Sequence, residues 1–210
     1  MNLYVANRED GFAHLINEME LKIGIEIGVR TGEYSEFLLQ NTNLELLYSL
    51  DIFPYYHMLT MTQEKLHKFG ARSQIVVGSS PAYADEFPDG YFDFIYIDAN
   101  HTYEGVYPDL THWWPKIRIG GLFCGDDYTN LTNPGEGKYG VVEAVNQFVV
   151  DYNQVLYITG AGNQSAKEFN RIANAYGKII EAGLNGKLDI KFGTTYDDDI
   201  KIPNWYMVKK

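Results

Sequence analysis

The sequence predicts an α/β fold of the Rossmann-like, doubly wound type, with a mostly parallel sheet and helices on both faces. Between residues 22 and 127, short apolar runs rich in Ile, Val and Leu alternate five times with helical patterns. Buried parallel strands read as such runs, and helices between them specify right-handed crossovers. The first run, Ile23 to Ile27, breaks into closely spaced glycines before a helical pattern begins, which is how a nucleotide pocket starts.

The first βαβ unit is expected to be complete by residue 51. Apolar residues recur at helical spacing from about Asp10 to Leu21, which predicts a helix leading into a strand over Lys22 to Gly28. A helix from Gly32 to Gln40 and a second strand from Leu46 to Asp51 follow.

The next elements continue the same alternation. Pro54 opens a helix to about Phe69, because proline is tolerated in the first turn. Strands are expected over Ser73 to Val77 and Phe92 to Asp98, with Gly78-Ser79-Ser80-Pro81 capping a short helix between them. A helix from Tyr103 to Trp114 ends where the following proline stops it.

The last part of the predicted sheet is less regular. Gly120-Gly121 is expected to make the turn into a fifth strand, Leu122 to Gly125. A helix over Val141 to Val150 and a sixth strand over Val155 to Thr159 follow. Asn204 to Val208 is expected to return as the last strand and to pair with the sixth as a hairpin.

Length and composition favour a single domain. The chain has 210 residues and 45% apolar content, enough to bury one substantial core. Residues 160–199 break the rhythm and are expected to be an insertion, with a helix over about 165–182. The loop from 129 to 138 is long enough to cover a site. The domain then consists of an N-terminal helix at 1–21, a ligand-binding core at 22–159, the insertion at 160–199 and the last strand at 200–210.

Charge and cysteine content limit the partners and the compartment. The formal charge of −11, from 28 acidic and 17 basic side chains, repels phosphate backbones and anionic membranes. We therefore expect no nucleic-acid and no membrane partner. Cys124 is the only cysteine, so an internal disulfide is ruled out. Without a secretory signal or an apolar run of ~20 residues, the sequence predicts a cytoplasmic protein.

The glycine turn after the first strand indicates the kind of ligand. Its spacing is Glu26-x-Gly28-x-x-x-Gly32, which differs from the Gly-x-Gly-x-x-Gly pattern that seats a dinucleotide pyrophosphate. The expected ligand therefore lacks a pyrophosphate. Asp51 follows Gly28 by 23 residues, close to the ~20-residue offset at which an acid reaches ribose hydroxyls. The alternative for Asp51 is capping of the next helix. Glu26 lies inside the first strand, where a buried carboxylate needs a partner or a ligand.

Three acids follow the fourth and fifth strands. Asp98 ends one strand, and Asp126 and Asp127 end the other, so adjacent strands ~4.8 Å apart would bring them together. Either one acid keeps its proton or a cation neutralises the group, and oxygen ligands favour Mg²⁺, with Mn²⁺ or Ca²⁺ as alternatives. Helix capping by Asp126 or Asp127 is the other interpretation. His101 is the candidate proton acceptor beside them, although loop histidines are often surface or capping residues.

These segments together resemble class I S-adenosylmethionine-dependent methyltransferases, in particular the metal-dependent small-molecule O-methyltransferases that include sugar-modifying enzymes of antibiotic pathways. The resemblance covers about residues 23–150. It rests on Glu26 to Gly32, Asp51, Gly78 to Ser80, Tyr96 to Gly105, and Gly120 to Tyr128. It implies a seven-stranded sheet whose last strand is antiparallel.

The same resemblance implies roles for particular residues. S-adenosylmethionine would contact Glu26, Gly28, Arg30, Thr31, Gly32, Asp51, Gly78, Ser79, Ser80 and Asp98. Asp98, Asp126 and Asp127 would hold a divalent cation that binds the acceptor hydroxyl, and His101 or Asp98 would take its proton. The insertion at 160–199 or a second subunit would cover the substrate, so a homo-oligomer stays open.

The sequence thus predicts methyl transfer to a hydroxyl of a small molecule, with a sugar or glycoside ahead of a phenol. One alternative is a protein that binds the cofactor without catalysis, in which case replacing Asp126 and Asp127 would leave cofactor affinity unchanged. The other is a nicotinamide-dependent oxidoreductase, against which the glycine spacing argues.

Overall fold

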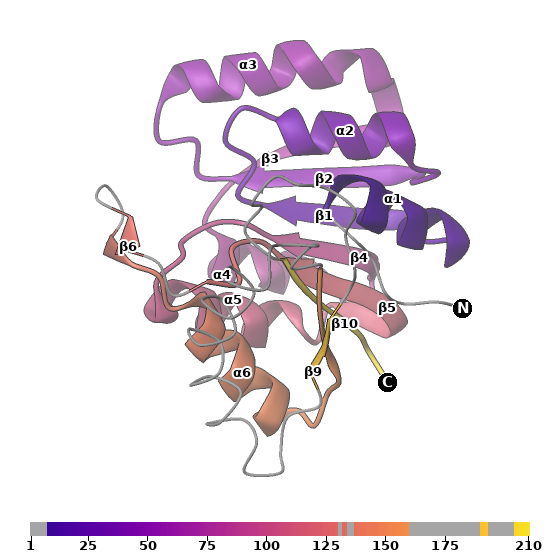
Figure 1. The fold of residues 1–210 in the computed structure, drawn as a ribbon. Helices are drawn as coiled ribbons and strands as arrows, with labels where there is room; N and C mark the ends of the chain where they lie inside the picture. Colours follow the sequence, from indigo (N-terminus) through magenta and orange to yellow (C-terminus); the bar gives the residue numbers. More distant parts are fainter. Residues whose placement is uncertain (1–7, 130–131, 134–136, 160–189, 193–203) are drawn as a thin grey trace, which may run out of the picture.

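A computed structural model describes residues 8–129, 132–133, 137–159, 190–192 and 204–210. Its main sheet has eight strands in the order β3-β2-β1-β4-β5-β10-β8-β9 (Figure 1). The strands are β1 Ile23–Ile27, β2 Leu46–Asp51, β3 Ser73–Val77, β4 Phe92–Ile97, β5 Ile117–Gly125, β8 Leu156–Ile158, β9 Ile190–Phe192 and β10 Trp205–Val208. Strands β1 to β5 run parallel, and β10 is antiparallel to both β5 and β8, which confirms the predicted doubly wound fold and its antiparallel last strand.

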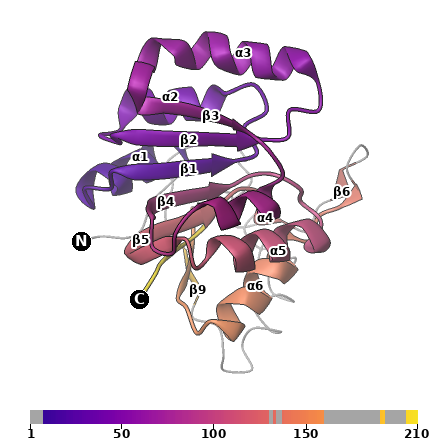
Figure 2. The same cartoon turned by 180° about the vertical axis from the view of Figure 1, so that it is seen from behind.

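Helices cover both faces of the sheet, as the alternation predicted. They are α1 Glu9–Glu18, α2 Glu33–Asn41, α3 Tyr56–Leu66, α4 Ser80–Tyr83, α5 Tyr103–Trp113 and α6 Val141–Asp151, with short 3-10 turns η1 His67–Arg72 and η2 Ala84–Glu86. Helices α1 to α3 lie on one face, and α4 to α6 lie on the other (Figures 1 and 2). Among these helices none is long and apolar enough to cross a membrane.

Alternating side chains of each strand feed two separate cores. In β4, Phe94 and Tyr96 pack with α1 and α2, whereas Ile95 and Ile97 pack with α5 and α6. All four side chains are buried. Because successive side chains of a strand point to opposite faces, one apolar run serves both helical layers. The apolar sequence of β4 is continuous because both of its faces are buried.

Strand β5 is longer than predicted. The Gly120-Gly121 pair lies inside β5 and does not make the turn before it. The pairing of β4 with β5 shifts register between Phe92 and Phe94, and Gly120 has a φ of 75°. The glycines therefore bend the strand without ending it, since their backbone tolerates a conformation that other residues resist. The amide of Gly120 donates to the carbonyl of Lys209 at 2.7 Å, which ties the bend to the chain after β10.

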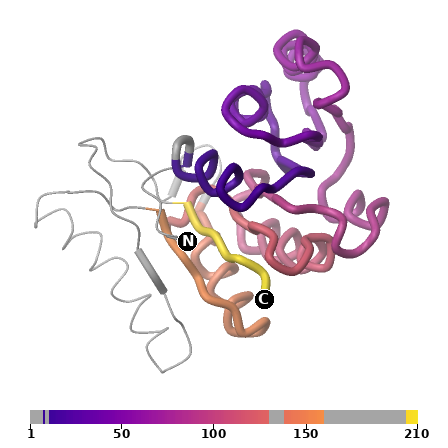
Figure 3. Tube along the Cα trace, turned by 90° about the vertical axis from the view of Figure 1, so that its right-hand side faces the viewer, coloured from indigo at the N-terminus to yellow at the C-terminus, as the bar shows by residue number. Residues whose placement is uncertain are grey.

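The far edge of the sheet differs most from the expectation. Strand β9 was not predicted, and it pairs in parallel with β8. Figure 3 shows β10, in yellow, running beside β8, in orange. The helix predicted over 165–182 lies outside the described residues. Parts of the predicted covering loop form the hairpin of β6 Thr132–Asn133 and β7 Gly137–Lys138.

Candidate active site

The carboxyl ends of β4 and β5 bring three acids together. Ile97 pairs with Gly125, so the residues that follow these strands lie side by side. The amide of Asp98 donates to the carbonyl of Ile27 at 2.7 Å, and the amide of Asp126 donates to that of Ile97 at 3.0 Å. We call Asp98, Asp126 and Asp127 the carboxylate cluster. Neither Asp126 nor Asp127 caps a helix, because α6 begins later with Gly140 at its N-cap.

His101 joins the carboxylate cluster, where the sequence expected it. Its Nε2 lies 3.2 Å from Oδ1 of Asp98 and 3.2 Å from Oδ2 of Asp127. The imidazole stacks on the ring of Tyr139, with 4.7 Å between centroids and 21° between planes. The carbonyl of His101 accepts from the amide of Gly140 at 2.8 Å, which connects this loop to the start of α6. The histidine is therefore held by carboxylates on its edge and by an aromatic ring on its face.

Arg8 also lies beside the cluster, although no sequence pattern pointed to it. Its Nη1 is 2.8 Å from Oδ2 of Asp126 and 4.0 Å from Oδ2 of Asp98. Its guanidinium lies over the Tyr34 ring at 4.7 Å from the centroid. Arg8 and Asp126 are 118 residues apart in the chain. No local spacing could have linked two such distant residues.

The electrostatics of the cluster match the expectation for crowded acids. Burial raises the pKa of Asp126 to about 7, and the nearby charge of Asp98 adds to that rise while Arg8 opposes it. In the part of the chain that the structure describes, no three His, Cys, Asp or Glu side chains are arranged to hold a metal ion. Arg8 and His101 instead lie among the carboxylates, so positive charge comes from the protein itself. Mg²⁺ binding by the cluster stays a prediction.

The glycine turn after β1 passes close to this cluster. Gly28 has a φ of 90°, and a Cβ built there would lie 1.9 Å from the carbonyl oxygen of Asp98. The sequence predicted a glycine here so that a ligand could approach. The structure gives a second reason, because a side chain at position 28 would clash with the backbone after β4. Gly32, with a φ of 84°, begins α2, and an added Cβ would meet Thr62. The close approach of the two loops places the turn directly beside Asp98.

Asp51 braces the glycine turn. Its Oδ2 accepts from the amides of Val29 at 2.8 Å and Arg30 at 2.7 Å, and its Oδ1 accepts from the amide of Phe53 at 2.7 Å. It does not cap the next helix, because α3 begins at Tyr56 after Tyr55. A carboxylate offers about four acceptor positions. Three backbone bonds leave one for a ribose hydroxyl, and that contact stays a prediction.

Of the five non-glycine residues with positive φ in the described part of the chain, three lie at these strand ends, and the other two, Glu20 and Asn153, lie elsewhere. Arg30 has a φ of 57°, Phe53 of 44° and Asp127 of 53°, although none of them is glycine. They follow β1, β2 and β5. Such conformations cost on the order of 1–3 kcal/mol each and cluster at binding and catalytic sites. The strain supports a functional assignment to this edge of the sheet.

Glu26 has a protein partner that the sequence left open. It is 2% exposed and accepts a hydrogen bond from the Ser35 hydroxyl of α2. The hydroxyl oxygens of Ser35 and Ser49 lie 2.6 Å apart, so hydrogen bonds link Glu26 through Ser35 of α2 to Ser49 of β2. Burial raises the pKa of Glu26 to about 8, against the lowering effect of Ser35. A direct contact of Glu26 with a cofactor stays a prediction.

The remaining predicted cofactor residues lie in the loops after β1 and β3 and at the start of α4. The amide of Gly78 donates to the carbonyl of Asp51 at 2.9 Å, which places residues 78–80 beside the second loop. Ser80 Oγ donates to Asp109 Oδ1 at 2.5 Å and accepts from Trp113 Nε1 at 2.9 Å. Thr31 Oγ1 donates to Glu33 at 2.5 Å. Both hydroxyls are engaged by the protein, and cofactor contacts of Thr31, Ser79 and Ser80 stay predictions.

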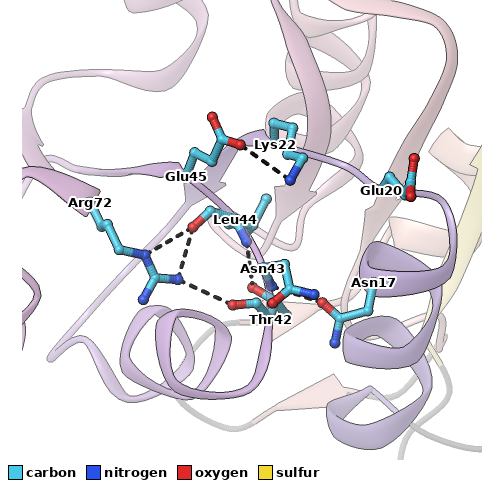
Figure 4. A pocket seen from close by; sticks show the side chains of 8 residues that line it. All are labelled: Asn17, Glu20, Lys22, Thr42, Asn43, Leu44, Glu45 and Arg72. Atoms are coloured by element: carbon cyan, nitrogen blue, oxygen red, sulfur yellow. Dashed lines mark hydrogen bonds and ion pairs between the residues drawn. The ribbon is translucent and has the colours of Figure 1, made fainter.

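A polar hollow elsewhere on the surface does not belong to this site (Figure 4). Its lining includes Lys22, Glu45 and Arg72, which precede β1, β2 and β3. Arg72 there donates to the backbone carbonyls of Leu44 and Thr42. The hollow therefore lies at the amino ends of the strands, away from the carboxylate cluster.

Comparisons with known proteins match the central part of the chain. Residues 25–128 match a family model described as a methyltransferase domain. Among solved structures, a putative O-methyltransferase from Klebsiella pneumoniae has 24% identity and a TM-score of 0.52, with 70% of this chain and 69% of that chain covered. No curated protein sequence matches the chain.

Two further structures cover more of the chain. A putative caffeoyl-CoA O-methyltransferase from Staphylococcus aureus has 15% identity and a TM-score of 0.56, covering 99% of this chain and 86% of that one. The O-methyltransferase TomG from Streptomyces achromogenes, solved with S-adenosylmethionine, has 15% identity and a TM-score of 0.56, covering 94% and 78%. At these identities the likeness shows the fold.

Proposed function

We propose that the chain is a class I S-adenosylmethionine-dependent methyltransferase that methylates a hydroxyl of a small molecule, a sugar or glycoside ahead of a phenol. One observation carries the proposal. A histidine is held between two carboxylates, and one of them, Asp98, lies against the glycine turn that Asp51 braces, the region from which this fold binds a nucleoside. A base beside the predicted cofactor site is well placed to take the proton of a hydroxyl that accepts the methyl group.

The residues have distinct roles in the proposed reaction. Carboxylates only accept hydrogen bonds, so Nε2 of His101 carries the hydrogen that lies between Asp98 and Asp127. The lone pair that takes the acceptor's proton is then on Nδ1. Asp98 and Asp127 orient the ring and stabilise the imidazolium that forms, because each adds negative charge 3.2 Å from Nε2. The acceptor oxygen, freed of its proton, becomes the nucleophile.

The cofactor supplies the other half of the chemistry. S-adenosylmethionine, when bound, supplies a methyl group on a positively charged sulfur, which leaves as the neutral thioether. Asp51 holds the turn at Val29 and Arg30 in the shape that receives the nucleoside, and keeps one acceptor position for its ribose. Much of the rate acceleration would come from this positioning of two reactants.

Divalent-metal assistance is the part of the sequence prediction that the described geometry fits least. Three carboxylates match Mg²⁺ in kind, since hard cations prefer oxygen ligands. Their oxygens, however, already face Arg8 and His101, and the residues as arranged do not fit a metal. We therefore route no step of the reaction through a metal ion. Covering of the substrate by 160–199 or by a second subunit also stays a prediction.

The proposal is tested by calorimetry with S-adenosylhomocysteine and a methyl-transfer screen on glycosides and catechols, using His101→Gln and the wild type. We expect His101→Gln to lower kcat by about 10²- to 10⁴-fold, the usual contribution of a general base. Affinity for S-adenosylhomocysteine should stay unchanged. His112→Gln is the matched control, because His112 lies exposed on α5 with its Nδ1 facing the carbonyl of Pro108.

Two outcomes would contradict the proposal. Nucleoside binding without methyl transfer to any acceptor would favour a binding protein without catalysis. Equal rates for His101→Gln and the wild type would remove the histidine from the mechanism and leave the fold assignment intact.

A further inference from the structure

Arg8 lies at the place where the sequence predicted a metal ion. Its Nη1 is 2.8 Å from Asp126 and 4.0 Å from Asp98, which are two of the three expected metal ligands. We propose that Arg8 is the resident cation of the carboxylate cluster, so that the enzyme works without a divalent metal. The catalytic part of this inference rests on the function proposed above, whereas its metal-binding part does not.

The position of Arg8 is built into the fold. Its carbonyl accepts from the amide of Phe12 at 3.1 Å, which makes Arg8 the N-cap of α1. Phe12 is fully buried and packs edge-on against Tyr206 at 5.5 Å between centroids. At its other end the guanidinium lies 4.7 Å from the centroid of Tyr34, a favourable arrangement for a cation over a ring. Backbone and side chain are thus both fixed, and the charge is directed at Asp126.

The positive charge of Arg8 opposes a metal ion on the same carboxylate oxygens. Nη1 of Arg8 places a positive charge 2.8 Å from Oδ2 of Asp126 and 4.0 Å from Oδ2 of Asp98, where the sequence expected the metal ion. A dication on the same oxygens would be repelled by the guanidinium a few ångströms away. Arginine stays protonated at any physiological pH, so its charge cannot be lost to make room for a metal. Removing the charge of Arg8 should therefore open the cluster to a divalent ion.

The experiment measures Mn²⁺ binding to the full chain by calorimetry and electron paramagnetic resonance. The variants are Arg8→Gln, which keeps length but removes charge, Arg8→Lys, which keeps charge, Asp126→Asn alone, and Arg8→Gln combined with Asp126→Asn. We expect no saturable Mn²⁺ site at the cluster in the wild type or in Arg8→Lys. Arg8→Gln should bind Mn²⁺ about tenfold more tightly or better, because a like charge is gone. The double variant should lose that gain.

Activity provides a second readout. Methyl transfer by the wild type should be unaffected by EDTA, and transfer by Arg8→Gln should fall and recover in part with Mn²⁺. A saturable Mn²⁺ site in the wild type that Asp126→Asn abolishes would overturn the proposal. A folded Arg8→Gln without any gain in Mn²⁺ binding would overturn it as well. Should Arg8→Gln fail to fold by circular dichroism, the comparison of wild type with Asp126→Asn still decides. Should no acceptor be found, the Mn²⁺ titrations decide without it.

Discussion

Glu26 ties the stability of the protein to pH. Its carboxyl group has a pKa of about 8 in the folded chain, mainly because of burial, against a reference value of 4.5. Between these values the folded state holds a proton that the unfolded state has lost. The stabilisation is therefore fully present below about pH 4.5 and disappears as the pH rises through about 8.

Glu26→Gln should remove this dependence, since an amide does not titrate and still bonds Ser35. From about pH 5 to about pH 8, its free energy of unfolding should fall less steeply than that of the wild type, by up to about 1.4 kcal/mol per pH unit. Denaturant unfolding at several pH values measures the difference. Glu45→Gln is the control, because Glu45 is exposed and paired with Lys22. Parallel curves for Glu26→Gln and wild type would show that Glu26 is not the group responsible.

Individual site residues differed in how well the sequence predicted them. Asp98 and Asp126 were found because parallel strands end at a common edge, so their meeting follows from the fold. The contact of Arg8 with Asp126 had no such rule behind it, since it depends on where α1 lies across the sheet. Predicting that Ser35 bonds Glu26 would have required knowing how α2 is rotated about its axis. Topology predicts backbone positions, whereas such side-chain pairs depend on the packing of helices.

At the scale of elements, the turn between β1 and α2 is tightly constrained. A Cβ at Gly28 would lie 1.9 Å from the Asp98 carbonyl oxygen, and the φ of 90° is unfavourable for other residues. Gly70 in η1 also has a positive φ, of 55°, but nothing lies within 4 Å of its position. The two glycines therefore separate the effect of close contact from that of backbone conformation.

Gly28→Ala should destabilise the protein by about 3 kcal/mol or more, because the added methyl group meets the Asp98 backbone, which is itself hydrogen-bonded to Ile27. Gly70→Ala should cost less, about 1–3 kcal/mol, because nothing lies near the added methyl group and only the backbone conformation, φ 55° and ψ −128°, is unfavourable for alanine. Denaturant midpoints of the two variants provide the measurement. Equal losses would mean that the loop after β4 yields to the added methyl group.

Elements were predictable where their apolar pattern was unbroken. The bounds of β2 and β3 agree with the expectation to the residue, because turn residues flank both apolar runs. The first half of β5 was missed, since Gly120-Gly121 is typical of a turn, and only long-range partners carry the strand through it: Ile117 pairs with Phe92 of β4, and both glycines hydrogen-bond to Lys209. Strand β9 was missed because its short, mixed segment depends on the neighbouring β8. Local sequence cannot report a strand that exists only through its partner.

At the scale of the molecule, ligand binding should raise thermal stability. A ligand at 100 times its Kd adds about 2.7 kcal/mol. For a chain of this size that corresponds to about 5–10 °C in Tm. We expect S-adenosylhomocysteine to produce such a shift and NADH to produce none, because the glycine turn lacks the dinucleotide spacing. Scanning calorimetry with each ligand tests this, and a shift with NADH alone would favour the oxidoreductase.

The place of β10 has a consequence for biosynthesis. Residues 205–208 fill the gap between β5 and β8, although β5 precedes them by some 80 positions. While the ribosome is still translating the intervening segment, the outer side of β5 offers unpaired amides and carbonyls to any neighbouring polypeptide. Newly made chains are therefore prone to aggregate until this last strand has been synthesised and has paired with β5.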